Sequence, residues 1–221
     1  MSKTVRLILG DQLNGNHSWF KTVDDSVTYV MMEIRTETDY AQHHIQKVVG
    51  IFAAMRAFAN ELQSKNHKFI YFHLNDENNL QSFDKNLQNL ILKHQFTHFE
   101  YQLPDEYRVD TILKDFCNTI SISSAVADSE HFFTTRNELG DFFQGKKTFL
   151  MESFYRAMRK KHHVLMEGDK PITGQWNYDG DNRMKLPKSH KPTAPFVFNT
   201  DVTKIHDEII KTDVKTIGTI D

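Results

Sequence analysis

Short β-rich runs alternate with amphipathic helical patterns along the first 126 residues of this 221-residue chain. The predicted strands are Thr4–Leu9, Val27–Glu33, Lys68–Leu74, Thr97–Gln102 and Ile120–Val126. Thr97–Gln102 alternates polar and apolar residues, as a more exposed strand does. Strands separated by single helices at this spacing favour parallel pairing with right-handed crossovers. The pattern predicts an α/β fold, a doubly wound, mostly parallel, five-stranded Rossmann-like sheet with helices on both faces.

The longest predicted helix follows the second strand, within the stretch Met31–Met55. Its core face is marked by apolar residues at three- and four-residue steps, which are Val48, Phe52, Met55, Ala59 and Leu62. Further helices are predicted at Leu80–Leu92, with Leu80 inward, and after Pro104, where proline and acids open the first turn.

A polar stripe is predicted at the amino-terminal end of the long helix. Thr36 and Asp39 resemble a capping box, and Tyr40, His44, Lys47 and Ile51 follow on one predicted face, with His43 beside them. Free backbone N–H groups at such a helix end can bind a polar ring that carries a hydroxylated tail. The alternative is that Tyr40 is a half-buried core residue and the histidines form a solvated face.

Polar residues also follow the first two strands. Gly10, Asp11 and Gln12 end the first strand and Glu33 ends the second. Open α/β sheets bind ligands at the carboxyl ends of their strands, so these residues are expected to lie near Glu37 and Tyr40. The dinucleotide pattern GxGxxG and the P-loop pattern are both absent after the first strand.

Charge and cysteine content exclude several classes of protein. Lys and Arg total 27 and Asp and Glu total 29, so the net charge is near zero. The net charge therefore gives no indication that the chain binds nucleic acid. Cys117 is the one cysteine and permits neither an internal disulfide nor an all-cysteine metal cluster. The apolar run near the amino terminus is too short for a signal peptide core or a membrane span, so we expect a cytoplasmic, soluble protein. We also expect it to be a monomer.

Common catalytic patterns are also missing. His43 and His44 are adjacent, as are His162 and His163, and adjacent side chains on a helix diverge by about 100°. No HExxH or GxSxG pattern occurs. We therefore expect no metal site and no catalytic residue in this chain, and Cys117 is interpreted as a buried, inert thiol.

The character of the chain changes after Phe133. Helices are predicted at Asn137–Phe143 and Phe149–His162, and the second has a basic side formed by Arg156, Arg159, Lys160 and Lys161. From Gly168 onward proline and scattered aromatics replace apolar runs, until a last predicted helix at Val202–Ile210. The aromatics Trp176, Tyr178, Phe196 and Phe198 suggest a segment that lies against another domain. We divide the chain into residues 1–135, a Rossmann-like ligand-binding domain, and 136–221, helices and a linker.

Ordered motifs across nearly the whole chain resemble the amino-terminal part of the iron–sulfur bacterial photolyases and cryptochromes, the photolyase-related group that includes bacterial (6-4) photolyases. They are Leu7–Leu13, Glu37 with Tyr40, His43, His44 and Lys47, Ala54–Arg56 with Phe58 and Ala59, Pro104 with Glu106 and Arg108, Gly145–Lys147, Met151–Glu152 with Phe154–Arg156 and Met158–Arg159, and Trp176–Asp179 with Asn182 and Arg183.

The resemblance implies a domain that binds an antenna chromophore, commonly 6,7-dimethyl-8-ribityllumazine, and passes light energy to a flavin. In the family, reduced FAD donates an electron to a (6-4) lesion flipped from DNA. FAD, the cysteines of a 4Fe–4S iron–sulfur cluster and the lesion contacts belong to a helical carboxyl-terminal catalytic domain, which these residues lack. The whole protein is then expected to be a photolyase-related lyase that binds damaged DNA, while this chain alone is not expected to repair it.

Carried over to this sequence, the resemblance places the antenna site at Gly10, Asp11, Gln12, Glu33, Glu37, Tyr40, His44, Lys47 and Ile51. Asp11 and Glu37 would accept hydrogen bonds from the ring or the ribityl hydroxyls. Tyr40 and Ile51 would cover the ring, and Lys47 would neutralise an acid. Three alternatives stay open: a photoreceptor cryptochrome of the same family, a stand-alone nucleotide- or ligand-binding module, and a structural domain that only docks a catalytic partner.

Overall fold

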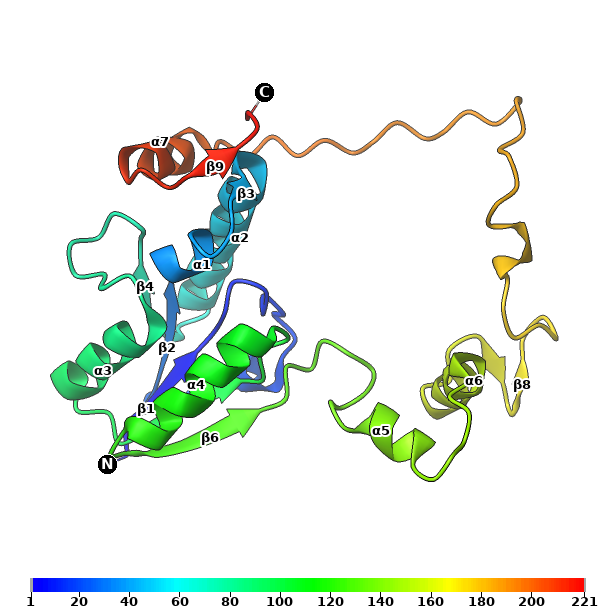
Figure 1. Cartoon of the computed structure of the whole chain (residues 1–221), viewed down its shortest axis with the longest axis horizontal. Coiled ribbons are helices and arrows are strands. Elements are labelled where there is room, and N and C mark those ends of the chain that lie inside the picture. The colour runs from blue at the N-terminus through cyan, green and yellow to red at the C-terminus, as the bar shows by residue number, and fades with distance from the viewer. Residues whose placement is uncertain (1, 221) are drawn as a thin grey trace. The chain divides into compact units, whose positions relative to one another are not determined.

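The computed structural model describes residues 2–220, which form two compact units (Figure 1). The first unit comprises the chain up to His131 together with the segment from Thr200 onward, and the second comprises Phe132–Asn199. The segment from Thr200 onward, predicted to belong with the linker, therefore packs with the Rossmann-like unit. Across the described residues, no helix has the length and apolar character that crossing a membrane requires.

A parallel sheet of five strands is the centre of the first unit. Its strands are β1 (Thr4–Leu7), β2 (Val27–Met32), β4 (Lys68–Phe72), β5 (His98–Gln102) and β6 (Ser123–Ala127), in the order β4-β2-β1-β5-β6. Every pairing in this sheet is parallel. The predicted α/β Rossmann-like fold is confirmed. The exposed strand is β6 at the sheet edge and not β5, which lies inside the sheet with Phe99 and Tyr101 buried.

Helices cover both faces of this sheet (Figure 1). Side chains alternate between the two faces along β1 and just beyond it. Leu7 lies in the core with residues of α3 (Phe83–His94) and α4 (Tyr107–Thr119), whereas its neighbour Ile8 packs with residues of α2 (Ile45–Ser64) and α7 (Thr203–Lys211).

Leu80, predicted to point inward from a helix, precedes α3 and is exposed. Cys117, predicted to be buried, is partly buried and packs against the core that contains Leu7. The remaining elements of the unit are the 3-10 helix η1 (Ser18–Phe20), α1 (Arg35–Thr38), β3 (His43–His44) and β9 (Thr216–Ile217).

The predicted start of the long helix is wrong. After the single turn of α1, the chain leaves the helical path and β3 pairs in parallel with β9, so α2 begins only at Ile45. Asp39 does not complete a capping box, because its carboxylate accepts hydrogen bonds from Arg35 Nε at 2.7 Å and Thr38 Oγ1 at 2.9 Å. The N-cap of α2 is His44, whose Nδ1 accepts from the Gln46 N–H at 3.2 Å. Tyr40 and Ile51 therefore do not share one helical face.

The second unit is a small helical body followed by an irregular segment. It contains α5 (Glu138–Phe143), α6 (Met151–Lys161), the antiparallel pair β7 (Met166–Glu167) and β8 (Lys170–Pro171), and the 3-10 turn η2 (Asp179–Asp181). Both predicted helices are present. The buried Arg159 guanidinium donates to backbone carbonyls of Val164, Leu165, Gln175 and Trp176, and so joins α6 to the loops that follow. The predicted connector aromatics Phe196 and Phe198 are both exposed.

The packing of α7 can be tested with two adjacent isoleucines. Ile209 is fully buried against the α2 side of the sheet, whereas Ile210 on the same helix is 58% exposed. We expect Ile209→Ala to lower the free energy of unfolding by about 2–5 kcal/mol, because it opens a cavity in the core. Ile210→Ala should change it by no more than about 0.5 kcal/mol. Urea denaturation measures both, and equal, small effects would show that α7 is not part of the folded unit.

Candidate functional site

A cavity of about 350 Å³ lies at the carboxyl ends of β1 and β2, between α2 and the loop from β5 to α4. Strand order reverses at β1, because β2 pairs with one of its sides and β5 with the other. Open α/β sheets bind ligands at such a switch point, and ligand pockets start at about 300 Å³. The inner walls are apolar and consist of Ile8, Leu9, Met32, Ile34, Val48, Ile51, Phe52, Met55, Phe83, Pro104 and Val109. The polar lining residues are Asp11, Glu37, Thr38, Tyr40, His43, Lys47 and Glu106.

Gly10 lets the end of β1 approach α2 at the floor of this cavity. A Cβ atom at this position would lie 2.9 Å from Met55 Sδ and 3.3 Å from Ile51 Cγ2. A side chain here would therefore require the Met55 side chain to shift at the floor of the cavity. Glycine at this position leaves that floor undisturbed.

Arg108 joins two sides of the cavity rim. Its guanidinium donates to both carboxylate oxygens of Glu37, at 2.9 and 3.2 Å, and to both of Glu106, at 2.7 and 3.0 Å. The same guanidinium lies 4.3 Å from the centre of the Tyr40 ring. The hydrogen bonds from Arg108 to Glu37, followed by those to Glu106, raise the pKa of Arg108, so it is always charged. Arg108 therefore connects α1, the turn after it and the start of α4.

Lys47 and Asp11 occupy other positions along the rim. Lys47 Nζ lies 3.1 Å from His43 Nδ1, and the His43 ring packs edge-on against Tyr40. Asp11 keeps an exposed outer side, yet burial of the rest of its carboxyl group raises its pKa, with a smaller contribution from Asp105. Lys47 can donate a hydrogen bond to a polar ligand, and the Asp11 carboxylate can accept one.

The structure brings six of the nine residues carried over by resemblance to the cavity, namely Gly10, Asp11, Glu37, Tyr40, Lys47 and Ile51. The side chains of Gln12, Glu33 and His44 are engaged elsewhere. Gln12 is 1% exposed and joins β1 to β5, because its Nε2 donates to the carbonyls of Gln102 and Leu103 while its Oε1 accepts from the Leu9 N–H. His44 caps α2, and its ring packs against Gly218 at a positive φ.

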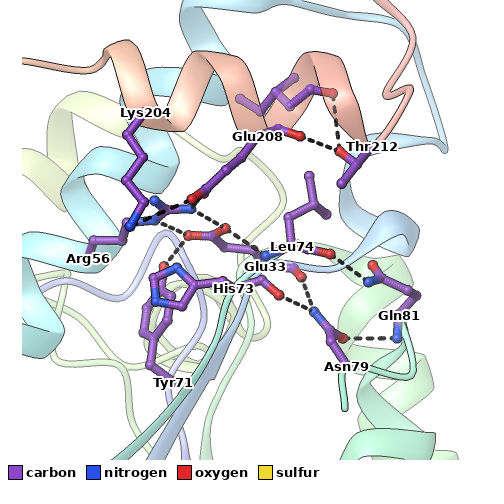
Figure 2. Close-up of polar contacts among 11 residues, drawn as sticks. Glu33, Arg56, Tyr71, His73, Leu74, Asn79, Gln81, Lys204, Glu208 and Thr212 are labelled. Atoms are coloured by element: carbon purple, nitrogen blue, oxygen red, sulfur yellow. Dashed lines mark hydrogen bonds and ion pairs between the residues drawn. The ribbon is translucent and has the colours of Figure 1, made fainter. Parts of the chain in front are cut away.

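Glu33 turns away from the cavity into a buried ion network (Figure 2). Its carboxylate is fully buried and accepts from Arg56 at 2.7 and 2.8 Å, from the Tyr71 hydroxyl at 2.7 Å and from the Leu74 N–H at 2.9 Å. Arg56 also donates to Glu208 of α7 at 2.5 Å. Burial alone lowers the pKa of Arg56, but the contacts with Glu33 and Glu208 outweigh it and raise the pKa. Burial and the Glu33 charge likewise raise the pKa of Tyr71.

The same network contains three groups that metal sites also use. One ligand atom each of Glu33, His73 and Glu208 lies within 4.8 Å of the other two. Arg56 already contacts both carboxylates and supplies the positive charge that a cation would bring. We therefore interpret the group as an ion-pair network that attaches α7 to the sheet.

The predicted site lacked Thr38 and His43 of the polar lining and, at the rim on the other side, Glu106 and Arg108. The last two join the rim through Glu37. Their position in the sequence was the available signal. Both follow Pro104 shortly after β5, and β5 and its parallel neighbour β1 end on the same side of the sheet. Their place at the rim depends on Glu37, which is distant in the sequence and contacts Arg108 only in the folded chain.

Residues 6–221 match the sequence model of a protein family described as deoxyribodipyrimidine photo-lyase-related protein. The chain belongs to this family. Over 214 residues it is 35% identical to a (6-4) photolyase of Agrobacterium fabrum, an alignment that covers 96% of this chain and 41% of the relative. It is also 26% identical over 154 residues to an uncharacterised protein of Acanthamoeba polyphaga mimivirus, covering 67% of this chain and 75% of that protein. The chain thus spans less than half the length of its Agrobacterium relative.

The structural role of Glu33 in this photolyase-related chain can be measured directly. Glu33→Ala leaves Arg56 with one of its two carboxylates and removes the acceptor for Tyr71 and Leu74. We expect the free energy of unfolding to fall by about 3–5 kcal/mol. The control is Glu61→Ala, which breaks an exposed pair with Lys65 and should cost less than about 0.5 kcal/mol. Similar values for the two variants in urea denaturation would contradict a stabilising role for the buried network.

Proposed function

We propose that the first unit is the antenna-binding domain of a photolyase-related protein and that its cavity binds 6,7-dimethyl-8-ribityllumazine. The observation that carries the proposal is the cavity itself, which combines apolar walls with a polar rim at the sheet's switch point. When bound, the lumazine would absorb violet light and transfer the energy to a flavin.

The residues present fit this chromophore. A flat heteroaromatic ring needs apolar surfaces on its faces, which Ile51, Phe52 and Val109 offer. A ribityl chain needs hydrogen-bond acceptors for its hydroxyls, and the carboxylates of Asp11 and Glu37 are of that kind. Lys47 adds a donor for ring carbonyl groups, and Tyr40 is placed to cover a ring near the cavity mouth.

For the whole protein we propose light-driven repair of (6-4) photoproducts in DNA, in line with the name of the Agrobacterium relative. FAD, the 4Fe–4S cluster and the lesion-binding groups would belong to a catalytic domain that partners this one. Cys117 is the one cysteine in the sequence, so four cluster ligands must come from outside these residues. Signalling as a cryptochrome of the same family is the alternative for the whole protein.

Titration of the purified chain with the lumazine tests the antenna proposal. We expect binding to appear as a change in absorption and in fluorescence anisotropy of the chromophore. Glu37→Ala should weaken this binding about 10- to 100-fold, the range expected for a lost hydrogen bond to a charged acceptor. The control is Glu77→Ala, because Glu77 is exposed and lies outside the cavity lining.

Circular dichroism of each variant separates a binding defect from unfolding. A wild-type chain that ignores the lumazine would refute the antenna proposal. Equal affinities for Glu37→Ala and wild type would remove Glu37 from the site but leave the cavity as the binding place.

A further inference from the structure

We propose that the charge arrangement around the cavity makes it selective for an uncharged, hydroxyl-bearing ligand and against the phosphorylated form of the same ligand, with Glu106 as a residue that determines this specificity. The inference rests on the proposed function, because it concerns the same cavity. It sets the site apart from nucleotide-binding sites, which occupy the same edge of similar sheets.

Two cations could attract a phosphate, Lys47 in the cavity lining and Arg108 at the rim, and two carboxylates already occupy Arg108. Glu37 and Glu106 each accept two hydrogen bonds from the guanidinium, and both are themselves cavity-lining residues. An arginine binds phosphate through the same planar N–H groups that these carboxylates use. To bind Arg108, a phosphate would have to displace Glu37 or Glu106 from the guanidinium. The displaced glutamate would then lose its ion pair with Arg108.

The remaining charges at the cavity are mainly negative. Asp11, Glu37 and Glu106 line it, and among the lining residues that the structure describes Lys47 is the only lysine or arginine. Asp105 lies close enough to Asp11 to contribute to the raised pKa of Asp11. Even with Arg108 included, the acidic side chains at the rim outnumber the basic ones.

The start of α4 does not change this balance. A free helix amino terminus attracts anions, but two carboxylates lie near the start of α4. Glu106 is the N-cap residue and its side chain bonds Arg108, and Asp110 in the first turn pairs with Lys114. Their negative charge opposes that of a phosphate at this helix end. The chain also lacks the glycine-rich turn that would let backbone N–H groups surround a phosphate.

A matched pair of ligands tests the inference: the lumazine and its 5′-monophosphate, titrated into the full chain at low salt. A phosphate monoester carries a charge of about −1.5 to −2 at neutral pH. We expect the unphosphorylated compound to bind at least about tenfold more tightly than the monophosphate, and the ratio to shrink as salt screens the rim charges. The ratio of the two dissociation constants cancels effects of a variant on cavity shape.

Two rim variants should move this ratio in opposite directions. Glu106→Gln leaves Arg108 with one carboxylate and should reduce the ratio severalfold, whereas Arg108→Gln leaves the carboxylates unopposed and should increase it. Glu77→Gln, the control outside the cavity, should leave the ratio unchanged. Adenosine and AMP serve as a second pair, chosen because an AMP preference would indicate a nucleotide site.

The outcomes separate the two proposals. Tighter or equal binding of the monophosphate by the wild-type chain, or a ratio that Glu106→Gln and Arg108→Gln both leave unchanged, would overturn the selectivity while the antenna function stands. A preference for AMP over adenosine would also overturn it. If the wild-type chain binds neither lumazine compound, the antenna proposal fails, and with it the selectivity that rests on it.

Discussion

The buried contact between Glu33 and Arg56 determines how the elements around the cavity are arranged. Glu33 directly follows β2, Arg56 lies in α2, Tyr71 in β4 and Glu208 in α7, so one network joins four elements (Figure 2). Buried charges are tolerated only when their hydrogen bonds are satisfied, and here each oxygen of Glu33 has at least two donors. The network thus favours one position of α2 over the sheet.

That position of α2 creates the cavity. The helix approaches the end of β1 closely at Gly10, where a Cβ atom would lie 2.9 Å from Met55 Sδ and 3.3 Å from Ile51 Cγ2. Further toward its amino terminus, Lys47 and Val48 lie on the opposite side of an open space from the loop that carries Glu106. Cavity shape therefore depends on buried packing and on the ion network, whereas cavity charge depends on the partly exposed residues of the rim.

The sequence predicted the sheet because strand and helix patterns are local, and the ends of each predicted strand lie within three residues of the observed ones. It predicted the helix start and part of the site less well, for physical reasons. A carboxylate at a strand end can turn to the ligand or into the core, and Glu33 turns inward only because Arg56 and Glu208 are placed to receive it. The pairing of β3 with β9 brings together segments from opposite ends of the chain, which no local periodicity reveals.

The rim shows how one sheet edge can serve different ligands. Nucleotide-binding relatives of this architecture leave backbone N–H groups and a helix terminus open to phosphate. Here Glu106 occupies the N-cap of α4, and Arg108, two residues later, is held by Glu106 and Glu37 together. Two carboxylates of the protein thus occupy the guanidinium that could otherwise bind an anion. What remains available to a ligand is apolar wall, carboxylate oxygen and the single ammonium group of Lys47, a combination that suits an aromatic ring with carbonyl and hydroxyl groups and disfavours additional negative charge.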